Sequence, residues 1–319
     1  MYGFIKVAAA VPSVRVADCK FNTTQIEGMM ARAEGLGVEI IVFPELSITG
    51  YTCQDLFQQQ ILLEEAETSL LKIMEFSHNL NITTIVGLPL AYDGMLLNCA
   101  AIIQGGKIYG IVPKTYIPNY KEFYEARWFS SASRLGRQEQ INFFGQQIPC
   151  GDHLLFNNGR FTFGVEICED LWATIPPSSK LSLHGAEIIF NLSSSNELVG
   201  KNAYLKGLIS NQSARCISGY VYAGSGYGES TQDIVFSGLG FIAENGHILE
   251  EGKRFSMQEQ LIVSEIDIDS LRQERRVNTT FASVKDLMQQ SDKGTYFQIE
   301  MHHTILDKER FTLTRNISS

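Results

Sequence analysis

The sequence predicts a layered α/β domain, and three features of the chain carry that prediction. Apolar runs rich in β-branched residues alternate with stretches of helical period along the chain. Residues 98–114 contain two such runs joined by a Gly-Gly turn, which is typical of a β-hairpin. The length of 319 residues suits one large domain or two small ones with a sizeable core. Strands and helices in mixed order, with several hairpins, are typical of layered α/β folds.

The individual elements follow from the local pattern of apolar residues. The expected strands are short apolar runs, and they cover 4–11, 38–46, 82–90, two segments within 98–114, 161–168, 186–194, 218–226, 235–252 and 259–268. The expected helices cover 23–37, 62–79, 176–184 and 200–216. The pattern weakens after residue 280, so we expect one domain over 1–280 and a linker or extension over 281–319.

Charge and hydropathy exclude several classes of protein. The chain has 26 basic and 35 acidic residues, a formal net charge of −9, and no basic stripe offsets this excess. A nucleic-acid partner is therefore not expected. No apolar run approaches the ~20 residues that a membrane helix needs. Residues 1–18 resemble a first strand and not a signal peptide, so we expect no membrane partner.

The cysteines and histidines show no pattern of a disulfide framework or a metal site. Six cysteines are widely scattered without a CxxC pair, and they are Cys19, Cys53, Cys99, Cys150, Cys168 and Cys216. The histidines form no HxH or HExxH pattern, and His302 and His303 lie in a polar tail. These observations predict a reduced, cytoplasmic protein without a bound metal.

A glycine-rich stretch, GSGYG at 224–228, raises the question of phosphate binding. A dinucleotide-binding loop must deliver its glycines to the N-terminus of a helix. The stretch is followed by STQDIVFSG (230–238), which we expect to be a strand, so we interpret the glycines as a turn. The chain also has no GxxxxGKS/T loop and no SGGxDS-type pyrophosphate loop. No nucleotide cofactor is expected on these residues.

Three apolar strands are expected to end on residues that can do chemistry. The sequence FPEL places Glu45 at the end of one strand, VPK places Lys114 at the end of another, and EIC places Cys168 at the end of a third. Each residue alone has an ordinary explanation: an edge carboxylate, a lysine that extends to solvent, and a small core thiol. Acidic neighbours would also make the thiol of Cys168 a poor nucleophile, and they are Glu166, Glu169 and Asp170.

Taken together, the three residues form a nucleophilic catalytic set. Ligand sites in layered α/β folds cluster at strand ends. A thiol, a carboxylate that acts as base and an ammonium that stabilises negative charge are the groups that acyl transfer needs. Lys114 would supply the cation that the acidic surroundings of Cys168 require.

The order Glu45, Lys114, Cys168 resembles the Glu-Lys-Cys pattern of the nitrilase, or carbon–nitrogen hydrolase, superfamily. Longer motifs are similar to those of the amidase domains of glutamine-dependent NAD+ synthetases. These motifs are FPELSITGYTCQDLF, PKTYIPNYKEFYEARWF, GVEICEDLW and NLSSSNELVGK. The resemblance covers about residues 1–280 of the sequence.

The resemblance implies a four-layer αββα sandwich that hydrolyses the amide of glutamine. It implies Glu45 as the general base, Cys168 as the nucleophile and Lys114 as an oxyanion stabiliser. Glu122, eight residues after Lys114, matches an additional glutamate that helps to position the substrate. Family positions that line the glutamine pocket correspond to Tyr51, Tyr120, Glu169, Trp172, Ser195 and Lys201. The backbone N–H of Glu169 would be the second oxyanion donor.

Free glutamine carries an α-ammonium and an α-carboxylate, and the pocket has to hold both. Glu169 could bind the ammonium and Lys201 the carboxylate, with Ser195 as a hydrogen-bond partner. One glutamate can act in turn as base for the thiol and as proton donor for ammonia. A preorganised donor aimed at the oxyanion typically contributes ~3 kcal/mol to the barrier.

In the family, a second domain with a pyrophosphate loop binds ATP, Mg²⁺ and deamido-NAD+ and receives the ammonia. The present sequence ends before such a loop, and ERFTLTR resembles the linker towards that domain. We therefore expect a glutaminase part without these cofactors, whose partner is the C-terminal synthetase domain. The family also forms homo-oligomers in which sandwiches pack on sandwiches.

Two alternatives remain open at this point. A stand-alone carbon–nitrogen hydrolase for a nitrile, an ω-amide or an N-carbamoyl compound would have the same three residues in a different pocket. The motif EICEDLW and the pair Tyr51 and Tyr120 favour the glutaminase. A non-catalytic module that scaffolds assembly would not need to retain Glu45, Lys114 and Cys168 together.

Overall fold

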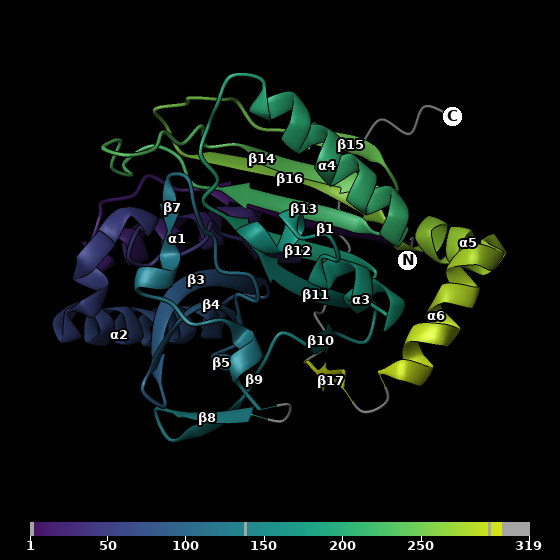
Figure 1. Ribbon diagram of the computed structural model, residues 1–319, viewed down its shortest axis with the longest axis horizontal. Coiled ribbons are helices and arrows are strands. Elements are labelled where there is room, and N and C mark those ends of the chain that lie inside the picture. The colour runs from purple at the N-terminus through teal and green to yellow at the C-terminus, as the bar shows by residue number, and fades with distance from the viewer. Residues whose placement is uncertain (1–2, 137–138, 293–294, 302–319) are drawn as a thin grey trace.

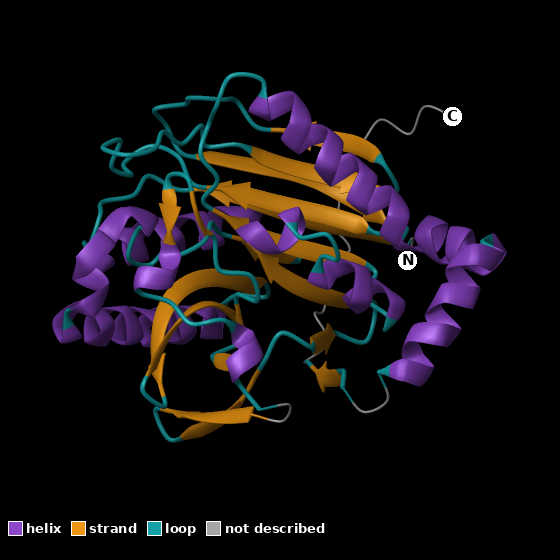
Figure 2. Cartoon of the chain, in the orientation of Figure 1, coloured by secondary structure: helices purple, strands orange, loops and turns teal. Residues whose placement is uncertain are grey.

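Two β-sheets pack face to face in the computed structural model of the chain, and helices cover both outer faces (Figure 1). The structure describes residues 3–136, 139–292 and 295–301. The layers follow one another as helix, sheet, sheet and helix, as Figure 2 also shows. This arrangement confirms the α/β class and the four-layer αββα sandwich.

The first sheet has eight strands. Their order across the sheet is β16 (Gln260–Asp267), β1 (Phe4–Val11), β2 (Ile40–Val42), β3 (Thr83–Tyr92), β4 (Met95–Gln104), β5 (Lys107–Pro113), β9 (Gln146–Cys150) and β8 (Glu139–Phe143). β1, β2 and β3 run parallel to one another, and β4 is antiparallel to both β3 and β5. β2, β3 and β5 therefore point their carboxyl ends in the same direction.

The second sheet has seven strands. Their order is β15 (His247–Glu251), β14 (Gly240–Glu244), β13 (Gly219–Gly224), β12 (Ile188–Ser193), β11 (Thr162–Ile167), β10 (Leu154–Asn157) and β17 (Phe297–Glu300). The central strands β11, β12 and β13 are parallel. Two short strands, β6 (Asn119–Tyr120) and β7 (Phe123–Tyr124), form a separate hairpin outside both sheets.

Helices form the two outer layers. α1 (Cys19–Gly35) and α2 (Gln60–Phe76) pack on the first sheet, whereas α3 (Pro177–Leu183) and α4 (Lys201–Cys216) pack on the second. α5 (Ile268–Val277) and α6 (Thr279–Ser291) follow at one end of the sandwich, on the right in Figure 1. Short 3₁₀ helices cover Tyr51–Gln58 (η1), Ser77–Asn79 (η2), Glu125–Arg127 (η3), Ala132–Arg134 (η4) and Cys168–Trp172 (η5).

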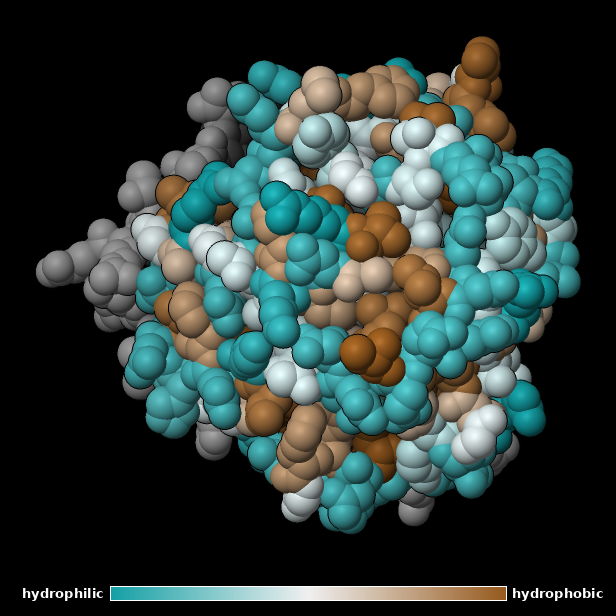
Figure 3. Space-filling view, turned by 90° about the vertical axis from the view of Figure 1, so that its left-hand side faces the viewer, coloured by the Kyte–Doolittle hydropathy of each residue, from teal (hydrophilic) through white to brown (hydrophobic). Residues whose placement is uncertain are grey.

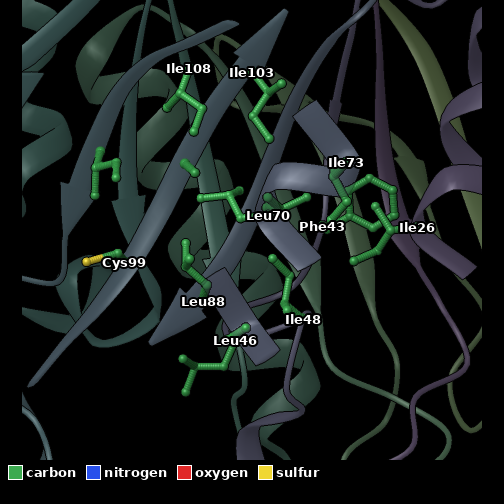
Figure 4. Close-up of a cluster of buried hydrophobic side chains, with 14 of the residues drawn as sticks. Ile26, Phe43, Leu46, Ile48, Leu70, Ile73, Leu88, Cys99, Ile103 and Ile108 are labelled. Atoms are coloured by element: carbon green, nitrogen blue, oxygen red, sulfur yellow. The ribbon is translucent and has the colours of Figure 1, made fainter. Parts of the chain in front are cut away.

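Three clusters of buried apolar side chains correspond to the three interfaces between these layers. Figure 4 shows part of the first cluster, where Ile26 of α1 and Ile73 of α2 lie with Leu88 and Ile103 of the sheet. The central cluster lies between the sheets and contains aromatic residues of the second sheet such as Phe163. Alternating residues of β1 divide between these two clusters because successive side chains of a strand point to opposite faces.

Figure 3 shows the face of the molecule that lies on the left of Figure 1. Hydrophobic side chains gather near the centre of this face, and hydrophilic ones surround them. Among the described residues, no helix is long and apolar enough to cross a membrane.

Several elements differ from the sequence-based expectation. α1 begins earlier than expected, at Cys19, because the side chain of Asp18 accepts a hydrogen bond from the N–H of Phe21 at 3.0 Å and caps the helix. The strand expected over 38–46 is shorter, since β2 covers Ile40–Val42 and the chain then turns.

The prediction of a strand at 230–238 was wrong. These residues form no regular element. The carboxylate of Asp233 accepts hydrogen bonds from the hydroxyl of Tyr124 at 2.6 Å and from Gln54 at 3.1 Å, and the N–H of Ser230 donates to Thr52. Polar contacts with η1 and the β6–β7 segment replace the ladder of a sheet, so the segment is a loop that covers these elements.

Regular structure also continues beyond residue 280. α6 buries none of its residues, which explains why its apolar pattern is weak. β17 pairs in parallel with β10, with Leu154 opposite Phe297, and forms the edge of the second sheet. Part of the extension expected over 281–319 therefore packs on the sandwich, and residues 302–319 lie outside the described residues.

Close contact between β3 and the turn after β2 fixes the position of Glu45. A Cβ atom added to Gly87 of β3 would lie 2.3 Å from the backbone nitrogen of Leu46 and 2.8 Å from the carbonyl oxygen of Pro44. Both neighbours are backbone atoms, which cannot rotate away as a flexible side chain could. Only glycine allows the turn that carries Glu45 to approach the strand this closely.

The substitution Gly87→Ala tests this constraint. We expect it to lower the free energy of unfolding by about 1–3 kcal/mol, the usual effect of overpacking. The matched control is Gly28→Ala in the exposed part of α1, where a Cβ has no atom within 4 Å. That control should stabilise the protein by about 0.5–1 kcal/mol. Urea unfolding of both variants provides the measurement, and equal stability of the two would contradict the prediction.

Candidate active site

Lys114 lies at the centre of a fully buried cluster of charges. It follows β5 directly, and its Nζ donates to Oε1 of Glu45 at 2.6 Å and to both carboxylate oxygens of Glu125 at 2.8 Å. All three side chains are buried. Burial acts to lower the pKa of the Lys114 ammonium. The negative charges of Glu125 and Glu45 have the larger effect, and they hold that pKa well above its usual value. The lysine therefore stays charged inside the protein.

The two oxygens of Glu45 have different surroundings. Oε1 accepts hydrogen bonds from Lys114 and from Nδ2 of Asn98, the latter at 2.7 Å. Oε2 is buried and has no hydrogen-bond partner among the described residues. A buried carboxylate oxygen without a donor is available to take a proton. The cluster thus offers one oxygen that is held in place and one that can act as a base.

Cys168 begins η5 at the end of β11, on the same side of the sandwich. Its thiol interacts electrostatically with Glu45, Lys114 and Glu125, so the three residues predicted from the sequence lie in one site. Burial raises the pKa of the thiol, the carboxylates raise it further, and Lys114 lowers it. The backbone of Cys168 has φ +46°, in the left-handed region that non-glycine residues rarely adopt. Such strain concentrates at functional sites.

Asp170 ties the end of β11 to the end of β5. Its carboxylate accepts hydrogen bonds from the N–H groups of Ile167 at 3.0 Å, Thr115 at 3.2 Å and Tyr116 at 2.8 Å. The first donor precedes Cys168, and the second follows Lys114. One carboxylate therefore sets the distance between the strand end that carries the thiol and the strand end that carries the ammonium.

Glu125 is the contact of Lys114 that sequence reasoning missed. It belongs to η3, is buried, and also accepts a hydrogen bond from the hydroxyl of Tyr51 at 2.8 Å. Burial raises the pKa of Glu125, and the ammonium of Lys114 opposes that shift. Glu122, which the family pattern suggested for this region, instead accepts a hydrogen bond from Nδ2 of Asn196. Both glutamates lie within the motif PKTYIPNYKEFYEARWF.

Other residues proposed for the pocket gather next to the three central residues. Tyr120 donates to the carboxylate of Glu169 at 2.8 Å. The ammonium of Lys201 donates to Oδ1 of Asn196 and lies 4.9 Å from the centre of the Trp172 ring. Burial lowers the pKa of Lys201, and the charges of Cys168, Glu122 and Glu169 oppose that shift, which places this ammonium within the same site.

The remaining pocket residues lie just after β12 and at the start of η1. Ser195 is half-buried and follows β12. Close by, the hydroxyl of Tyr222 donates to Ser193 of β12 at 2.7 Å, and burial and the charge of Cys168 raise the pKa of Tyr222. Tyr51 begins η1, and its N–H donates at 2.7 Å to Glu229 of the loop after β13. The same carboxylate accepts from the N–H and the hydroxyl of Thr52. Glu229 was not predicted, and it fixes the segment that presents Tyr51.

The described residues contain no group of three or more His, Cys, Asp or Glu side chains arranged to hold a metal ion. The reactive groups in the cluster are a thiol, a base with an unpartnered oxygen, and a buried cation. That set supports nucleophilic attack on a carbonyl carbon.

Comparison with known proteins agrees with this chemistry. The family model for carbon-nitrogen hydrolases matches residues 6–276. The chain belongs to the carbon–nitrogen hydrolase family. This hydrolase chain is 36% identical over 283 residues to the glutamine-dependent NAD(+) synthetase of Mycobacterium tuberculosis, a match that covers 88% of this chain and 41% of the relative. The chain thus spans less than half the length of the curated relatives that it matches.

Solved structures of the same family share the fold. A glutamine-dependent NAD(+) synthetase from Cytophaga hutchinsonii superimposes with a TM-score of 0.74 at 29% identity, over 82% of this chain and 43% of that one. A carbon-nitrogen hydrolase from Helicobacter pylori superimposes with a TM-score of 0.69 over 88% of this chain and 95% of that one. The identity with the latter is 18%, so it shows the sandwich fold alone.

The reactivity of the six cysteines tests the cluster. At neutral pH we expect iodoacetamide to label Cys168 first although burial and the carboxylates raise its pKa. The reason is that Glu45 can take the thiol proton as the sulfur attacks, while Lys114 stabilises the developing thiolate. Glu45→Gln should slow this labelling by about 10²-fold, since it removes the base. Peptide mass mapping over time provides the measurement.

The matched control for this labelling is Glu65→Gln, because Glu65 is a carboxylate that interacts with another buried thiol, that of Cys19. It should leave the labelling of Cys168 unchanged. Label found first on Cys53 or Cys150 would show that the cluster does not activate Cys168.

Proposed function

We propose that this chain hydrolyses the side-chain amide of glutamine to glutamate and ammonia through a thioester at Cys168. The observation that carries the proposal is the buried ammonium of Lys114, held between Glu45 and Glu125 beside the thiol. The choice of glutamine rests on the relatives, which are named glutamine-dependent NAD(+) synthetases. The catalytic residues are Glu45, Lys114 and Cys168.

In the first half-reaction the thiol attacks the amide carbon. Oε2 of Glu45 takes the proton of Cys168 as the sulfur forms its bond to carbon, and the carbonyl becomes an oxyanion. Lys114 and the backbone N–H of Glu169 stabilise that negative charge. Glu45 then gives its proton to the amide nitrogen, the carbon–nitrogen bond breaks, and ammonia leaves a thioester.

In the second half-reaction water replaces the sulfur. Glu45, again ionised, removes a proton from a water molecule, and the resulting hydroxide adds to the thioester carbon. The carbon–sulfur bond then breaks, Glu45 returns the proton to the sulfur, and glutamate leaves. One carboxylate serves both halves, which agrees with the unpartnered Oε2 of Glu45.

Glu125 keeps Lys114 in the state and place that this reaction needs. An ammonium in a buried site would lose its proton without anionic neighbours. Glu45 cannot fill this role throughout, because it is neutral while it holds the proton taken from Cys168 or from water. Glu125 contacts Lys114 through both oxygens and is itself held by Tyr51, so the cation retains a partner at each step.

The pocket chemistry suits a free amino acid. Glu169 with Tyr120 offers an anionic group for the α-ammonium, and Lys201 with Ser195 offers a cation and a hydroxyl for the α-carboxylate. The ammonium of Lys201 lies over the Trp172 ring, and Glu122 holds Asn196, the hydrogen-bond partner of that lysine. In this proposal these residues set the preference for glutamine over simple amides and nitriles.

We propose that the ammonia serves ATP-dependent NAD+ synthesis. The relatives carry that function in their names, and this chain covers 41% of their length. ATP, Mg²⁺ and deamido-NAD+ would bind to a synthetase domain and not to residues 1–319. Exposed apolar side chains support a homo-oligomer formed through the layer of α3 and α4, and they include Ile175 just before α3, Val199 just before α4 and Tyr204 of α4. Free cysteines are in keeping with a cytoplasmic location.

Substrate and cofactor dependence test this proposal directly. We expect weak release of ammonia from glutamine, less from asparagine, ureidopropionate and simple nitriles, and none from the variant Cys168→Ala. ATP and deamido-NAD+ together should not accelerate the reaction, because coupling needs contacts that differ between two states of a partner. Acceleration would show that residues 1–319 contain a nucleotide site, and a preference for another substrate would favour a stand-alone hydrolase.

A second test separates the two neighbouring glutamates. Glu125→Gln should lower kcat by about 10²-fold or more, since Lys114 loses the partner that remains charged during proton transfer. Glu122→Gln, the matched control, should act mainly on KM because it contacts Asn196 and not the ammonium. Steady-state kinetics of both variants provides the measurement. Equal losses of kcat would contradict the different roles.

A further inference from the structure

A chain of buried hydrogen bonds lies behind the nucleophile, across three neighbouring strands of the second sheet. The N–H of Cys168 donates to Oδ1 of Asn191 at 3.3 Å, and Nδ2 of Asn191 donates to the hydroxyl of Tyr220 at 3.0 Å. That hydroxyl donates to Oε1 of Glu166. Glu166 of β11 and Asn191 of β12 are register partners, and Tyr220 lies on β13. Each of these residues is at most 5% exposed.

Glu166 has no role in the reaction proposed above, yet it is a carboxylate in the interior of the sheet, 1% exposed. Its second oxygen accepts the N–H of Ser178 at the start of α3 at 2.8 Å. Burial of a carboxylate is costly even when it is hydrogen-bonded. A glutamine or an apolar residue would satisfy the packing at lower cost, so the carboxylate itself calls for an explanation.

The chemistry of the four groups gives the chain a fixed direction. An ionised carboxylate can only accept, so the hydroxyl proton of Tyr220 must point to Glu166. The oxygen of Tyr220 then presents only lone pairs to Asn191, which must turn its NH₂ group towards it. The other amide atom, Oδ1, is left to face the N–H of Cys168. The negative charge at one end thus decides which atom of Asn191 meets the nucleophile at the other.

We propose that Glu166 is a positioning residue that orients the Asn191 amide and, through it, the backbone of the nucleophile. The inference rests on the function proposed above and deepens it. Cys168 has φ +46°, and the next N–H, that of Glu169, is the proposed oxyanion donor. Oδ1 of Asn191, which accepts from the N–H of Cys168, holds in place the peptide group that precedes this strained residue. Loss of that acceptor releases the turn on which the oxyanion donor depends.

A pair of variants tests the direction of the chain. In Glu166→Met the hydroxyl of Tyr220 loses its acceptor and donates to Asn191, whose amide turns and places its NH₂ against the Cys168 N–H. We expect kcat to fall by about 10-fold or more, as for other partners that act through a neighbour, with KM changed less than about twofold. Adding Tyr220→Phe to this variant removes the hydroxyl donor that would turn the side-chain amide of Asn191.

The double variant Glu166→Met/Tyr220→Phe should therefore be more active than Glu166→Met alone, by about threefold or more, because coupled sites are not additive. A network that served only stability would give the opposite order, since the double variant loses more buried contacts. Thermal unfolding of each variant reports the folded fraction, to which the rates are normalised. The matched control, Tyr92→Phe, removes a Tyr–Glu hydrogen bond in the first sheet and should leave kcat unchanged.

A second readout does not depend on glutamine hydrolysis. Protein labelled with ¹⁵N-cysteine should show six backbone amide signals, one for each cysteine, and Cys168→Ser identifies the relevant one. The Cys168 amide proton should shift upfield in Glu166→Met and return towards its original position in the double variant. If Glu166→Met does not fold, the same amide signal is recorded in Tyr220→Phe alone, which keeps Glu166. The Cys168 amide signal should stay in place in that variant.

The outcomes separate the inference from the proposed function. The Cys168 amide proton could shift as expected in the variants while the unmodified chain fails to hydrolyse glutamine. That result would support the role of Glu166 and refute the proposed glutaminase function. Normal hydrolysis with an unmoved Cys168 signal in Glu166→Met, or a double variant less active than that single variant, would overturn the role of Glu166.

Discussion

The burial of the Lys114 ammonium is the constraint on which the rest of the site depends. A cation in the interior of a sandwich is stable only with anionic and hydrogen-bonding partners at close range. These partners come from separate parts of the chain: Glu45 from the turn after β2 and Glu125 from η3, with Asn98 of β4 holding Glu45. The fold must therefore bring all of them together, and the same contacts that stabilise the cation leave one carboxylate oxygen free for chemistry.

The two sheets meet at this cluster through backbone contacts as well as through charge. Asp170 binds N–H groups at the ends of both β11 and β5, one strand from each sheet. Gly87 permits the close approach that fixes the turn of Glu45. These devices are rigid, whereas the residues that would contact a substrate lie on η1, the β6–β7 segment and the start of α4. A rigid set of reacting groups beneath loops that hold the substrate is the usual arrangement of α/β enzymes.

Glu125, which was not predicted, shows where reasoning from the sequence fails. Glu45, Lys114 and Cys168 follow apolar strands, whose ends are recognisable from local pattern. Glu122 and Glu125 lie in a segment of two-residue strands and one short 3₁₀ helix. These elements are too short for apolar periodicity to indicate which side chain points inwards. Glu125 enters the core because its N–H binds the carbonyl of Pro118 and its carboxylate meets Lys114. Neither contact leaves a signature in the spacing of residues.

The sequence by itself determined the α/β class, most strands of both sheets, the hairpin of β4 and β5, and the three strand ends that carry chemistry. These features follow from apolar periodicity and turn residues, which act over a few neighbouring positions. Only the tertiary structure decided which carboxylate pairs with Lys114, that Asn191 faces the N–H of Cys168, that 230–238 is a loop and that β17 joins β10. Each of these depends on contacts between distant parts of the chain or on a loop without periodicity, where burial and charge in the folded state, and not local preference, select the partner.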